Sequence, residues 1–433
     1  MKAVIMAGGK GTRLSSITDG VIPKSMVSIN GIPILEYQIR LLIRYRIEEV
    51  IIITGFLHTV IENYFGNGDK FGLPITYIIE DTPKGTGGRL PLLEKYINDD
   101  FIVLFGDLVC DFSIQRMLEA HIKKNALITL FAHPNAHPFD SDLLVIDEGH
   151  KVTGYYSKHE TRQKWHKNLV NAGIYIINPR IFSLLPKKEV MDLEKDIIFP
   201  FCNQGNEIVA YISTEYVKDI GTPDRLQAAE HDMNTGIIQK KNLDNPQKCI
   251  FLDRDGTLNK LNGLIYDPEQ LELEETAANA IKEINNSDYL AIVITNQPVV
   301  ARGLCSENTV AMIHNKLETL LGAQGAYLDG IYYCPHHPDT GYEGENVKYK
   351  IACHCRKPDI GLIEDCVRHF NISLKHSFFI GDSTGDIQTG KNAGLKTVLL
   401  KTGEAGLDKK YDVYPDYIAD TVFCAVKKIL EKE

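Results

Sequence analysis

Short runs of apolar residues that end abruptly in polar residues recur along this chain. They cover residues 3–7 and 101–105 in the first half, and 250–252, 291–294 and 378–380 in the second. Runs of this length and composition are typical of strands buried in a sheet. Ligand crevices of parallel α/β sheets open at the carboxyl ends of the strands, so the polar residues after each run are the candidate functional positions. The pattern predicts an α/β fold in both halves.

The length of the chain and one polar stretch predict two domains. With 433 residues the chain is long enough for two separate cores. Residues 236–247 are polar and rich in lysine, and Pro246 stands just before the apolar run at 250–252. We therefore expect a Rossmann-like domain at 1–235, a linker at 236–247 and a second Rossmann-like domain at 248–433.

Charge and cysteine content narrow the class of partner. The net charge of −10 argues against nucleic acid or an anionic membrane as the main partner, which leaves small molecules. No apolar run approaches the roughly 18 residues of a membrane span, and the amino terminus lacks the features of a signal peptide. Nine cysteines without secretion signals favour reduced thiols or metal ligands over disulfides. We expect a cytoplasmic protein, and the sequence leaves an oligomer open.

Two carboxylates one residue apart follow the apolar run 250–252. Asp253 and Asp255 would face opposite ways along a regular strand, but the turn at Gly256 allows both to reach one site. Carboxylates this close repel one another unless a cation or a shared proton relieves them. Mg²⁺ is the expected cation, because it prefers a few carboxylates together with phosphate oxygens of a substrate.

Three later pieces of the second half fit the same chemistry. Thr295 ends another apolar run, Arg356-Lys357-Pro358 places positive charge before a predicted helix, and a further run leads to Asp382, with Asp386 four residues on. Paired aspartates, a threonine, a lysine and a final aspartate, in this order, resemble the four motifs of the haloacid-dehalogenase-like phosphatases. The resemblance covers about residues 248–433.

This resemblance implies a catalytic role for each motif residue. Asp253 would attack the phosphorus and form an aspartyl-phosphate. Asp255 would protonate the leaving sugar oxygen and then activate the water that hydrolyses the intermediate. Thr295 and Lys357 would neutralise the phosphoryl oxygens, and Arg356 would contribute to substrate recognition.

The same resemblance implies a magnesium site. Its ligands would be Asp253, the backbone carbonyl of Asp255, and Asp382. The role of Asp386 stays open between a partner of this site and an acid that caps a helix.

A second candidate metal site lies in the polar loop before Arg356. Cys334 and His336 form one closely spaced pair, and Cys353 and Cys355 form another. Four ligands of this kind at paired spacing are typical of tetrahedral structural Zn²⁺. A zinc loop at this place resembles the heptose-1,7-bisphosphate phosphatases and the related histidinol phosphatases.

That narrower resemblance also implies contacts with the substrate from Asn296, Gln297 and Arg302. The chain departs from the subfamily at Pro298, because Ser-Gly usually follows the glutamine. The departure concerns the orientation of the substrate at this turn.

In the first half, a glycine-rich turn follows the apolar run 3–7. Such a turn lets backbone N–H groups surround phosphate oxygens without side-chain clashes. The stretch AGGKGTRL at 7–14, followed by Pro23-Lys24, resembles the sugar-1-phosphate nucleotidylyltransferases, and further matches continue to about residue 230. The resemblance implies attack by a sugar-1-phosphate oxygen on the α-phosphorus of a nucleoside triphosphate, which expels pyrophosphate.

The family's functional residues map onto this chain in three groups. The nucleotide would contact the loops that contain Ala7, Gly8, Gly9, Gly11, Thr12, Gly85, Thr86, Gly87 and Gly88. Arg13 and Lys24 would take up charge on the triphosphate, while Asp107 and Asp219 would bind Mg²⁺. The sugar phosphate would contact Lys158, Asn171 and Gly173, although the basic stretch that begins at Lys158 is also consistent with a solvated loop.

The fusion of the two halves suggests consecutive steps. The resemblances together imply removal of the 7-phosphate from D-glycero-D-manno-heptose 1,7-bisphosphate and then transfer of GMP from GTP to the heptose 1-phosphate. One alternative keeps both activities but uses a hexose 1-phosphate of the mannose or glucose type and a substrate like histidinol phosphate. A second alternative is a regulatory protein whose transferase-like half only binds nucleotide.

Overall fold

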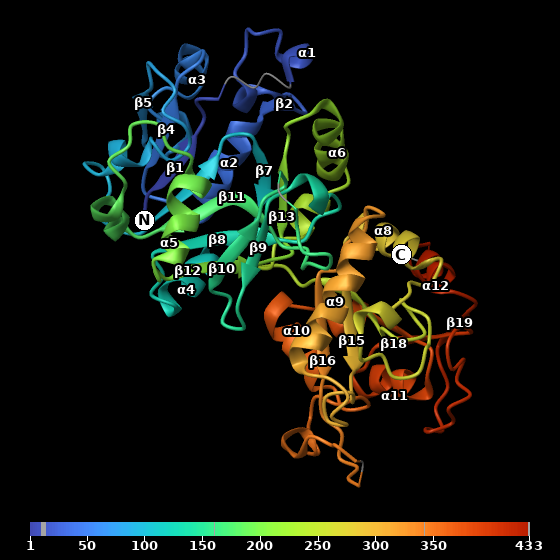
Figure 1. Ribbon diagram of the computed structural model, residues 1–433. Coiled ribbons are helices and arrows are strands. Elements are labelled where there is room, and N and C mark those ends of the chain that lie inside the picture. Colours follow the sequence, from blue (N-terminus) through green and yellow to red (C-terminus); the bar gives the residue numbers. More distant parts are fainter. Residues whose placement is uncertain (10–13, 160, 342, 432–433) are drawn as a thin grey trace. The chain divides into compact units, whose positions relative to one another are not determined.

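In a computed structural model, which describes residues 1–9, 14–159, 161–341 and 343–431, the chain divides into two compact units (Figure 1). The first unit contains Met1–Ala132, Leu144–Tyr155 and Asn171–Asn242. The second contains His133–Leu143, Tyr156–Val170 and Leu243–Glu433. The division between Asn242 and Leu243 falls within the predicted linker 236–247, part of which is helix α7 (Ile237–Lys240).

A nine-stranded sheet, counted over the described residues, forms the centre of the first fold. Its main path is β10 (Val152–Tyr156), β9 (Leu143–Ile146), β11 (Val170–Ile177), β6 (Phe101–Phe105), β1 (Ala3–Met6), β4 (Val50–Thr54) and β5 (Ile75–Ile79). Off this path, β8 (Ile128–His133) pairs with β11 and with β12 (Ile208–Ile212). The two predicted runs, β1 and β6, are parallel to one another, and β4, which the sequence did not single out, is also parallel to β1.

Helices and two small sheets complete this fold. The helices are α1 (Ser15–Thr18), α2 (Ile34–Arg44), α3 (His58–Phe65), α4 (Ile114–Lys123), α5 (Phe199–Asn203), α6 (Pro223–Asn234) and α7. The small sheets pair β2 (Ser28–Ile29) with β3 (Ile32–Pro33), and β7 (Leu108–Asp111) with β13 (Tyr216–Asp219). Buried residues of α2 and α3 share one core with Ala3, Ile5 and Ile52 of the main sheet, which leaves the strand ends free to carry polar loops.

The second unit is built on a parallel sheet. Its order is β16 (Gly330–Cys334), β15 (Tyr289–Asn296), β14 (Lys248–Leu252), β17 (Phe378–Gly381), β18 (Lys396–Leu400) and β19 (Tyr417–Ala419). The helices are α8 (Ala277–Asn285), α9 (Glu307–Gly322), α10 (Gly361–Phe370), α11 (Thr384–Asn392) and α12 (Val422–Leu430). Successive strands are added on one side of β14 up to β16 and on its other side from β17 onward, so the switch point where α/β sheets of this kind bind ligands lies between β14 and β17.

The side chains of β14 explain why it lies at the centre of this sheet. Ile250 and Leu252 belong to the core that contains α8, α9 and α12, whereas Cys249 and Phe251 belong to the core that contains α10. Successive side chains of a strand point to opposite faces, so an uninterrupted apolar run requires helices on both. The first polar residue after the run, Asp253, then lies at the end of the strand rather than on a face.

Two segments between strands of the first sheet belong to the second unit. These are residues 133–143 and 156–170. Within that unit, the backbone N–H of His166 donates to Thr319 Oγ1 (3.1 Å), and the N–H of Asn168 donates to Glu318 Oε2 (3.1 Å). The unit boundaries therefore differ in detail from a simple division at one linker.

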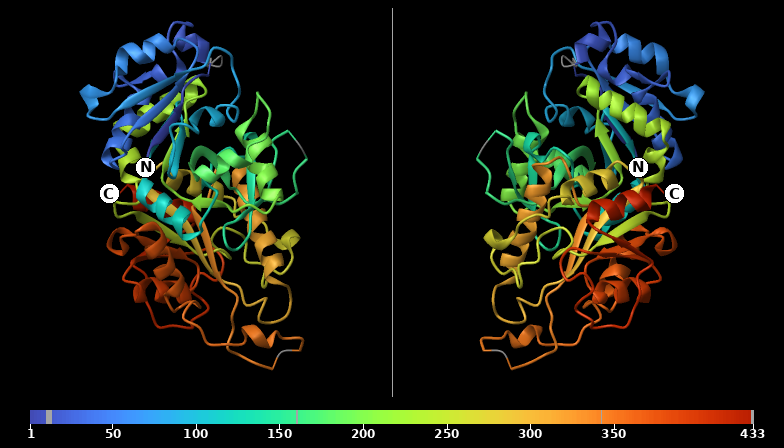
Figure 2. Two further views of the ribbon diagram at one scale, coloured as in Figure 1. Left: turned by 90° about the vertical axis from the view of Figure 1, so that its left-hand side faces the viewer. Right: turned by 90° about the vertical axis from the view of Figure 1, so that its right-hand side faces the viewer.

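The segment between β16 and α10 extends away from the sheet of the second unit in both views (Figure 2). It contains the paired cysteines and histidine of the predicted zinc loop. No helix among the described residues is long and apolar enough to cross a membrane.

We predict that the core between α10 and the sheet of the second unit depends on Phe251. Its ring is fully buried and stacks on Phe379 with a centroid distance of 6.5 Å. Phe251→Ala should lower the free energy of unfolding by about 3–5 kcal/mol, because it removes the ring and leaves a cavity. Urea unfolding would measure this loss. Tyr414→Ala, at a side chain that is 81% exposed, is the control and should stay within about 0.5 kcal/mol of wild type. Equal stability of all three proteins would contradict the described packing.

Candidate active sites

Three carboxylates meet at the carboxyl end of the central strands of the second unit. Asp253 follows β14, Asp382 follows the neighbouring strand β17, and Asp386 lies in the first turn of α11. One ligand atom from each of them lies within 4.8 Å of the others. The parallel pairing of β14 and β17 therefore brings together residues that are more than a hundred positions apart.

Lys357 places a positive charge among these carboxylates. Its Nζ donates to Asp253 Oδ1 (2.7 Å), to Asp386 Oδ1 (2.6 Å) and to the carbonyl oxygen of Ile294 (3.0 Å). The Asn296 side chain accepts from the Lys357 N–H (3.0 Å) and donates to the Lys357 carbonyl (3.1 Å). Asn296 therefore fixes the backbone that carries the lysine.

Asp386 has both of the roles that the sequence left open. Its Oδ1 pairs with Lys357, while its Oδ2 accepts from Ser383 Oγ (2.6 Å) and from the Ser383 N–H (3.1 Å) in a capping box at the start of α11. One carboxylate thus joins the amino-terminal end of the helix to the lysine of the site.

The site holds more negative charge than one lysine neutralises. Burial, followed by the charge of Asp386, raises the pKa of Asp253 to about 7. Burial, followed by the charge of Asp253, raises the pKa of Asp382 to about 8. The pKa of Lys357 is raised, because the attraction of Asp253 and Asp386 outweighs its burial. Oxygen ligands with this excess of charge fit a hard divalent cation such as Mg²⁺.

Asp255 lies in a different electrostatic environment from Asp253. Burial favours its neutral form, but the charge of Arg254 and hydrogen bonds from Asn259 and Gln297 together hold its pKa below the usual value. Gln297 Nε2 donates to Asp255 Oδ2 (2.9 Å) and to Thr295 Oγ1 (3.0 Å). The structure thus brings Thr295, Gln297 and Asp255 together as neighbours.

The two arginines predicted for substrate contact, Arg302 and Arg356, both follow this region in the sequence. Arg356 Nη1 donates to the carbonyl oxygen of His336 (3.0 Å), which ties the residue before Lys357 to the cysteine loop. Arg302 lies in the turn after β15, where its N–H donates to the Pro298 carbonyl (2.9 Å).

A loop that the sequence did not single out supports Asp382. Asp382 Oδ2 accepts from the Glu404 N–H (2.7 Å), and Thr402 Oγ1 donates to the Gly256 carbonyl (2.7 Å). A Cβ on Gly403 would lie 1.9 Å from Asp382 Oδ2. The only sequence signal is the pair of glycines at 403 and 406, which is too common to indicate a role.

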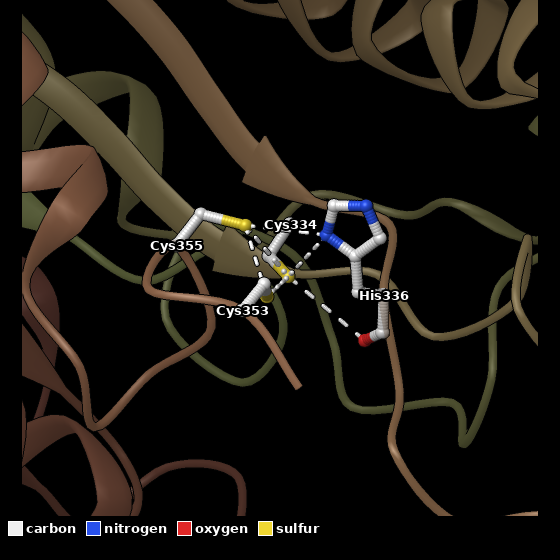
Figure 3. Close-up of side chains that lie close together, drawn as sticks. All are labelled: Cys334, His336, Cys353 and Cys355. Atoms are coloured by element: carbon white, nitrogen blue, oxygen red, sulfur yellow. Dashed lines mark hydrogen bonds between the residues drawn. The ribbon is translucent and has the colours of Figure 1, made fainter. Parts of the chain in front are cut away.

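The four predicted zinc ligands lie together in the second unit (Figure 3). The sulfur–sulfur distances are 3.5 Å between Cys334 and Cys353, 3.3 Å between Cys334 and Cys355, and 3.2 Å between Cys353 and Cys355. His336 Nδ1 lies 3.3 Å from Cys355 Sγ. A tetrahedron with Zn–S bonds of about 2.3 Å has edges of roughly 3.8 Å, so the cluster is close to the size that zinc requires.

In the first unit, Lys24 and two aspartates form the corresponding cluster. Asp107 follows β6, and Asp219 is the last residue of β13, whose pairing with β7 places it beside Leu108. Lys24 Nζ forms an ion pair with Asp107 Oδ2, and the Ile220 N–H donates to the Asp107 carbonyl (3.1 Å). The structure therefore brings Lys24, Asp107 and the end of β13 together, as the motifs predict.

Arg225 is a charged neighbour of this cluster that the motifs did not indicate. Its Nη1 donates to Asp219 Oδ2 (2.5 Å) from the first turns of α6. Burial raises the pKa of Asp219, but the hydrogen bond and charge of Arg225 outweigh it, so the net shift is downward. Asp219 is thus held as a carboxylate before any cation binds.

The second predicted nucleotide loop, at residues 85–88, is held in place by contacts with another segment of the first unit. The N–H groups of Gly87 and Gly88 donate to the Met191 carbonyl (2.9 and 3.2 Å), and the Leu193 N–H donates to Thr86 Oγ1 (2.9 Å). Gly85 has a positive φ of 75° and lies against Met191, where a Cβ would clash at 2.3 Å. The loop that carries Gly85 to Gly88 is therefore fixed by its contacts with residues 191–193.

A buried ion pair lies beneath the first glycine loop. Arg89 Nη2 lies 2.8 Å from Glu80 Oε2, and a Cβ on Gly8 would lie 2.8 Å from the same nitrogen. Gly9 has open space in the place of a side chain, and Ala7 closes the buried end of β1. Glu80 and Arg89 flank the second loop in the sequence, yet no familiar motif contains them. The predicted positions Gly11, Thr12 and Arg13 lie outside the described residues.

The predicted sugar-phosphate residues fall into different units. In the first unit, Asn171 Nδ2 donates to Glu194 Oε1 (2.6 Å), and Asn171 Oδ1 accepts from the Gly173 N–H (3.2 Å). Lys158 belongs to the second unit, where its N–H donates to Asp142 Oδ1 (2.7 Å). Glu194 is a polar residue of this area that the sequence motifs did not reveal.

The two sites define an enzyme that combines nucleotidyl transfer with phosphoester hydrolysis. A family model described as nucleotidyl transferase matches residues 2–236, and one described as HAD-hydrolase-like matches residues 354–423. Because the first model covers more than half of the chain, the chain belongs to the nucleotidyl transferase family, and it carries a HAD-like phosphatase domain at its other end.

Relatives of known name resemble each part. The D-glycero-beta-D-manno-heptose-1,7-bisphosphate 7-phosphatase of Haemophilus ducreyi is 36% identical over 41% of this chain and 97% of the relative. The mannose-1-phosphate guanylyltransferase of Mycobacterium tuberculosis is 30% identical over 54% of this chain and 65% of the relative. A solved structure, HddC from Yersinia pseudotuberculosis complexed with GMP-PN, is 27% identical over 54% of this chain and 99% of its own, with a TM-score of 0.47.

We predict that Gly403→Ala disables the phosphatase site by displacing Asp382. The new Cβ would overlap the carboxylate, and a misplacement of about 1 Å can cost about 10²-fold in rate. Release of orthophosphate from a sugar bisphosphate would measure the loss. Gly394→Ala is the matched control, because Gly394 also has a positive φ (74°) but has no atom within 4 Å of its Cβ position. A loss of similar size in both variants would assign the effect to backbone strain. It would contradict the role of Gly403 in positioning Asp382.

Proposed function

We propose that this chain removes the 7-phosphate from D-glycero-D-manno-heptose 1,7-bisphosphate and then transfers GMP from GTP to the resulting heptose 1-phosphate. The products would be orthophosphate, pyrophosphate and GDP-heptose. The observation that carries the proposal is that one chain holds two separate lysine–carboxylate sites, one in each unit. The 36% identity across nearly the whole of a heptose bisphosphate phosphatase supports the choice of sugar.

For the phosphatase step, Asp253 is the proposed nucleophile. Its carboxylate oxygen attacks the phosphorus at C7, and the bond to the sugar oxygen breaks. Asp255, whose protonated form a dianionic phosphate nearby favours, gives its proton to that oxygen. Water then gives a proton to Asp255 and attacks the aspartyl-phosphate, which releases orthophosphate and restores Asp253. Lys357, which pairs with Asp253, and Thr295, which accepts from Gln297, would donate hydrogen bonds to the phosphoryl oxygens.

Because its carboxylates outnumber its lysine, this site would bind a dianionic phosphate together with a cation. Asp253 and Asp382 would hold Mg²⁺ together with the backbone carbonyl of Asp255, and the ion when bound neutralises phosphoryl charge. Lys357 keeps Asp253 and Asp386 in place by pairing with both. Asn296 in turn fixes the backbone of Lys357.

For the transferase step, positioning and charge neutralisation are the proposed means of catalysis. The C1 phosphate oxygen of the sugar attacks the α-phosphorus of GTP, and the bond to pyrophosphate breaks. Asp107 and Asp219 would hold Mg²⁺, which when bound stabilises negative charge on the α-phosphate. Lys24 and Arg13 would take up charge on the triphosphate, and Asn171, Gly173 and Lys158 would contact the sugar phosphate.

The order of the two steps follows from their chemistry. Nucleotidyl transfer needs a phosphate at C1 as its nucleophile, so the phosphatase must spare that group and remove the one at C7. GTP is the proposed donor, since a pocket that pairs with guanine leaves buried groups unmatched when adenine enters. Nucleotide and sugar phosphates and free thiols suit the cytoplasm, where we place the protein.

A second candidate function keeps both reactions and changes the sugar. The 30% identity to a mannose-1-phosphate guanylyltransferase supports a hexose 1-phosphate as the acceptor in the first unit. That relative is covered over only 65% of its length, whereas the heptose phosphatase is covered over 97%. The fusion of the two halves gives a direct use for the phosphatase product only with the heptose.

The two-step proposal predicts the products of one incubation. With heptose 1,7-bisphosphate of either anomer, GTP and Mg²⁺, orthophosphate should appear first, followed by pyrophosphate and a mass equal to GDP-heptose. Asp253→Asn should stall at the bisphosphate, and Asp107→Asn should stall at heptose 1-phosphate, since each change neutralises one nucleophile or metal ligand. Replacing GTP by ATP should lower the rate.

Mass spectrometry of the same samples distinguishes the alternatives. A nucleotide-hexose that forms far faster from mannose 1-phosphate would move the chain to the second candidate function. Loss of both reactions in either folded variant would contradict two separate sites. Binding of GTP without pyrophosphate release, with any sugar phosphate, would indicate a regulatory protein instead.

We further propose that Cys334, His336, Cys353 and Cys355 bind one structural Zn²⁺. Burial raises the pKa of the Cys355 thiol to about 11, so the thiolate that zinc requires needs the charge of the metal. Among its described residues, the loop between Cys334 and Cys353 has little regular structure apart from a turn of 3₁₀ helix at Val347–Tyr349. Zinc would therefore order the segment that leads to Lys357.

The zinc proposal predicts close to one Zn per purified chain. The double change Cys353→Ser and Cys355→Ser should lower the zinc content and the melting temperature of the second unit, because two thiolate ligands are lost. Elemental analysis and thermal unfolding would measure both. Cys424→Ser, at an exposed cysteine outside the cluster, is the control. Native protein without zinc and with unchanged melting would contradict the assignment.

A further inference from the structure

Arg254 lies between the two catalytic aspartates in sequence, and its side chain is fully buried. It is the largest fully buried side chain among the described residues. Burial of a guanidinium ion carries a desolvation cost that a well-placed partner must offset. A charge held at this cost next to a reactive carboxylate points to a role at the site.

The hydrogen bonds of Arg254 are directed at Asp255. Nε donates to Asp255 Oδ1 (3.2 Å), and Nη2 lies 2.9 Å from each of the two carboxylate oxygens. Nη2 also donates to Gln297 Oε1 (3.0 Å). Over the described part of the chain, Nη1 has no hydrogen-bond partner, so the other two nitrogens carry all of these bonds.

Gln297 and Asn259 complete a clamp on the same carboxylate. Gln297 Nε2 donates to Asp255 Oδ2 (2.9 Å), and Asn259 Nδ2 donates to Asp255 Oδ1 (3.0 Å). Both carboxylate oxygens are therefore held by donors. The Asp255 side chain still keeps 21% of its surface exposed, whereas that of Arg254 has none.

The clamp also separates Asp255 from the other carboxylates. Asp253, Asp382 and Asp386 cluster around Lys357, and the group that could share a metal ion contains these three side chains without Asp255. Fixing the carboxylate of Asp255 by arginine and glutamine keeps it out of that cluster. Asp255 thereby stays outside the carboxylate cluster, with part of its side chain exposed.

We propose that Arg254, together with Gln297, is a positioning residue that orients the Asp255 carboxyl group, which gives a proton to the leaving sugar oxygen and then, as a carboxylate, takes one from the attacking water. The inference rests on the proposed phosphatase function. It assigns to Gln297 an action through Asp255, in addition to any contact with substrate. Arg254 itself touches neither substrate nor metal in this account.

The proposal predicts a dependence on the leaving group. A sugar alkoxide must be protonated as the P–O bond breaks, whereas 4-nitrophenolate leaves without a proton. In both cases hydrolysis of the aspartyl-phosphate then needs Asp255 as a carboxylate that takes a proton from water. After 4-nitrophenolate leaves, Asp255 first releases its own proton to solvent. Arg254→Met should therefore lower kcat for the sugar bisphosphate by about 10² or more, within the usual range for general acid–base catalysis, with little change in KM.

With 4-nitrophenyl phosphate, the same variant should release one equivalent of 4-nitrophenolate at close to the wild-type rate. Turnover should then become slow, because hydrolysis of the aspartyl-phosphate is impaired. Stopped-flow absorbance would measure this burst. Arg254→Lys should recover only part of the sugar bisphosphate activity, since an ammonium group cannot reproduce two bonds to one carboxylate.

Two further variants distinguish loss of the clamp from a general loss of structure. Gln297→Met removes the neutral half of the clamp without leaving a charge unpaired, and it should show the same burst if Arg254→Met does not fold. Arg368→Met, at an arginine whose side chain is 68% exposed, is the control and should behave as wild type. Melting curves and the nucleotidyl transfer rate of each sample confirm that the chain is intact.

The outcomes test the positioning role of Arg254 separately from the proposed phosphatase function. If wild type hydrolyses neither substrate, the phosphatase function fails. If wild type is active and the folded clamp variants lose both substrates equally, without a burst, or raise only KM, the positioning role of Arg254 is wrong.

Discussion

The ion pairs of Lys357 are the interaction on which the phosphatase site depends. Its ammonium group contacts Asp253 and Asp386, while its backbone is held by Asn296. Lys357 thereby joins three places that lie far apart in the sequence. They are the end of β14, the end of β15 and the start of α11. Without this charge, the repulsion among Asp253, Asp382 and Asp386 would oppose the very packing that brings β14 and β17 together. Removal of one partner from a buried pair typically leaves an uncompensated charge, which costs several kcal/mol.

The same arrangement occurs in simpler form in the first unit. Lys24 pairs with Asp107, and Arg225 pairs with Asp219, so each carboxylate already has a cationic partner before substrate arrives. In both sites, carboxylates at or near the ends of strands thus pair with positively charged side chains. The strands are dictated by uninterrupted apolar runs, and the chemistry is confined to the first polar residues after them.

Much of this could be predicted from the sequence because strand ends and short motifs are local features. The apolar runs predicted β1, β6, β14, β15 and β17, and the spacing of Cys334, His336, Cys353 and Cys355 predicted their cluster. What could not be predicted depends on side chains that meet only in the folded chain. Gly403 packs against Asp382 from a loop that contains no motif, and the ion pair of Glu80 and Arg89 lies against Gly8. Asp386 caps α11 and also pairs with Lys357. The assignment of residues 156–170 to the second unit likewise follows from contacts with α9 that no local pattern encodes.

The central claim is that one chain removes the phosphate at C7 and keeps the phosphate at C1 for nucleotidyl transfer. ³¹P NMR of heptose 1,7-bisphosphate during incubation with the protein, GTP and Mg²⁺ would follow each phosphorus separately. The account predicts that the signal of the C7 phosphomonoester disappears first, and that the anomeric signal persists and is then converted into the paired signals of a sugar diphosphate nucleotide. Early loss of the anomeric signal, with the C7 signal intact, would contradict it.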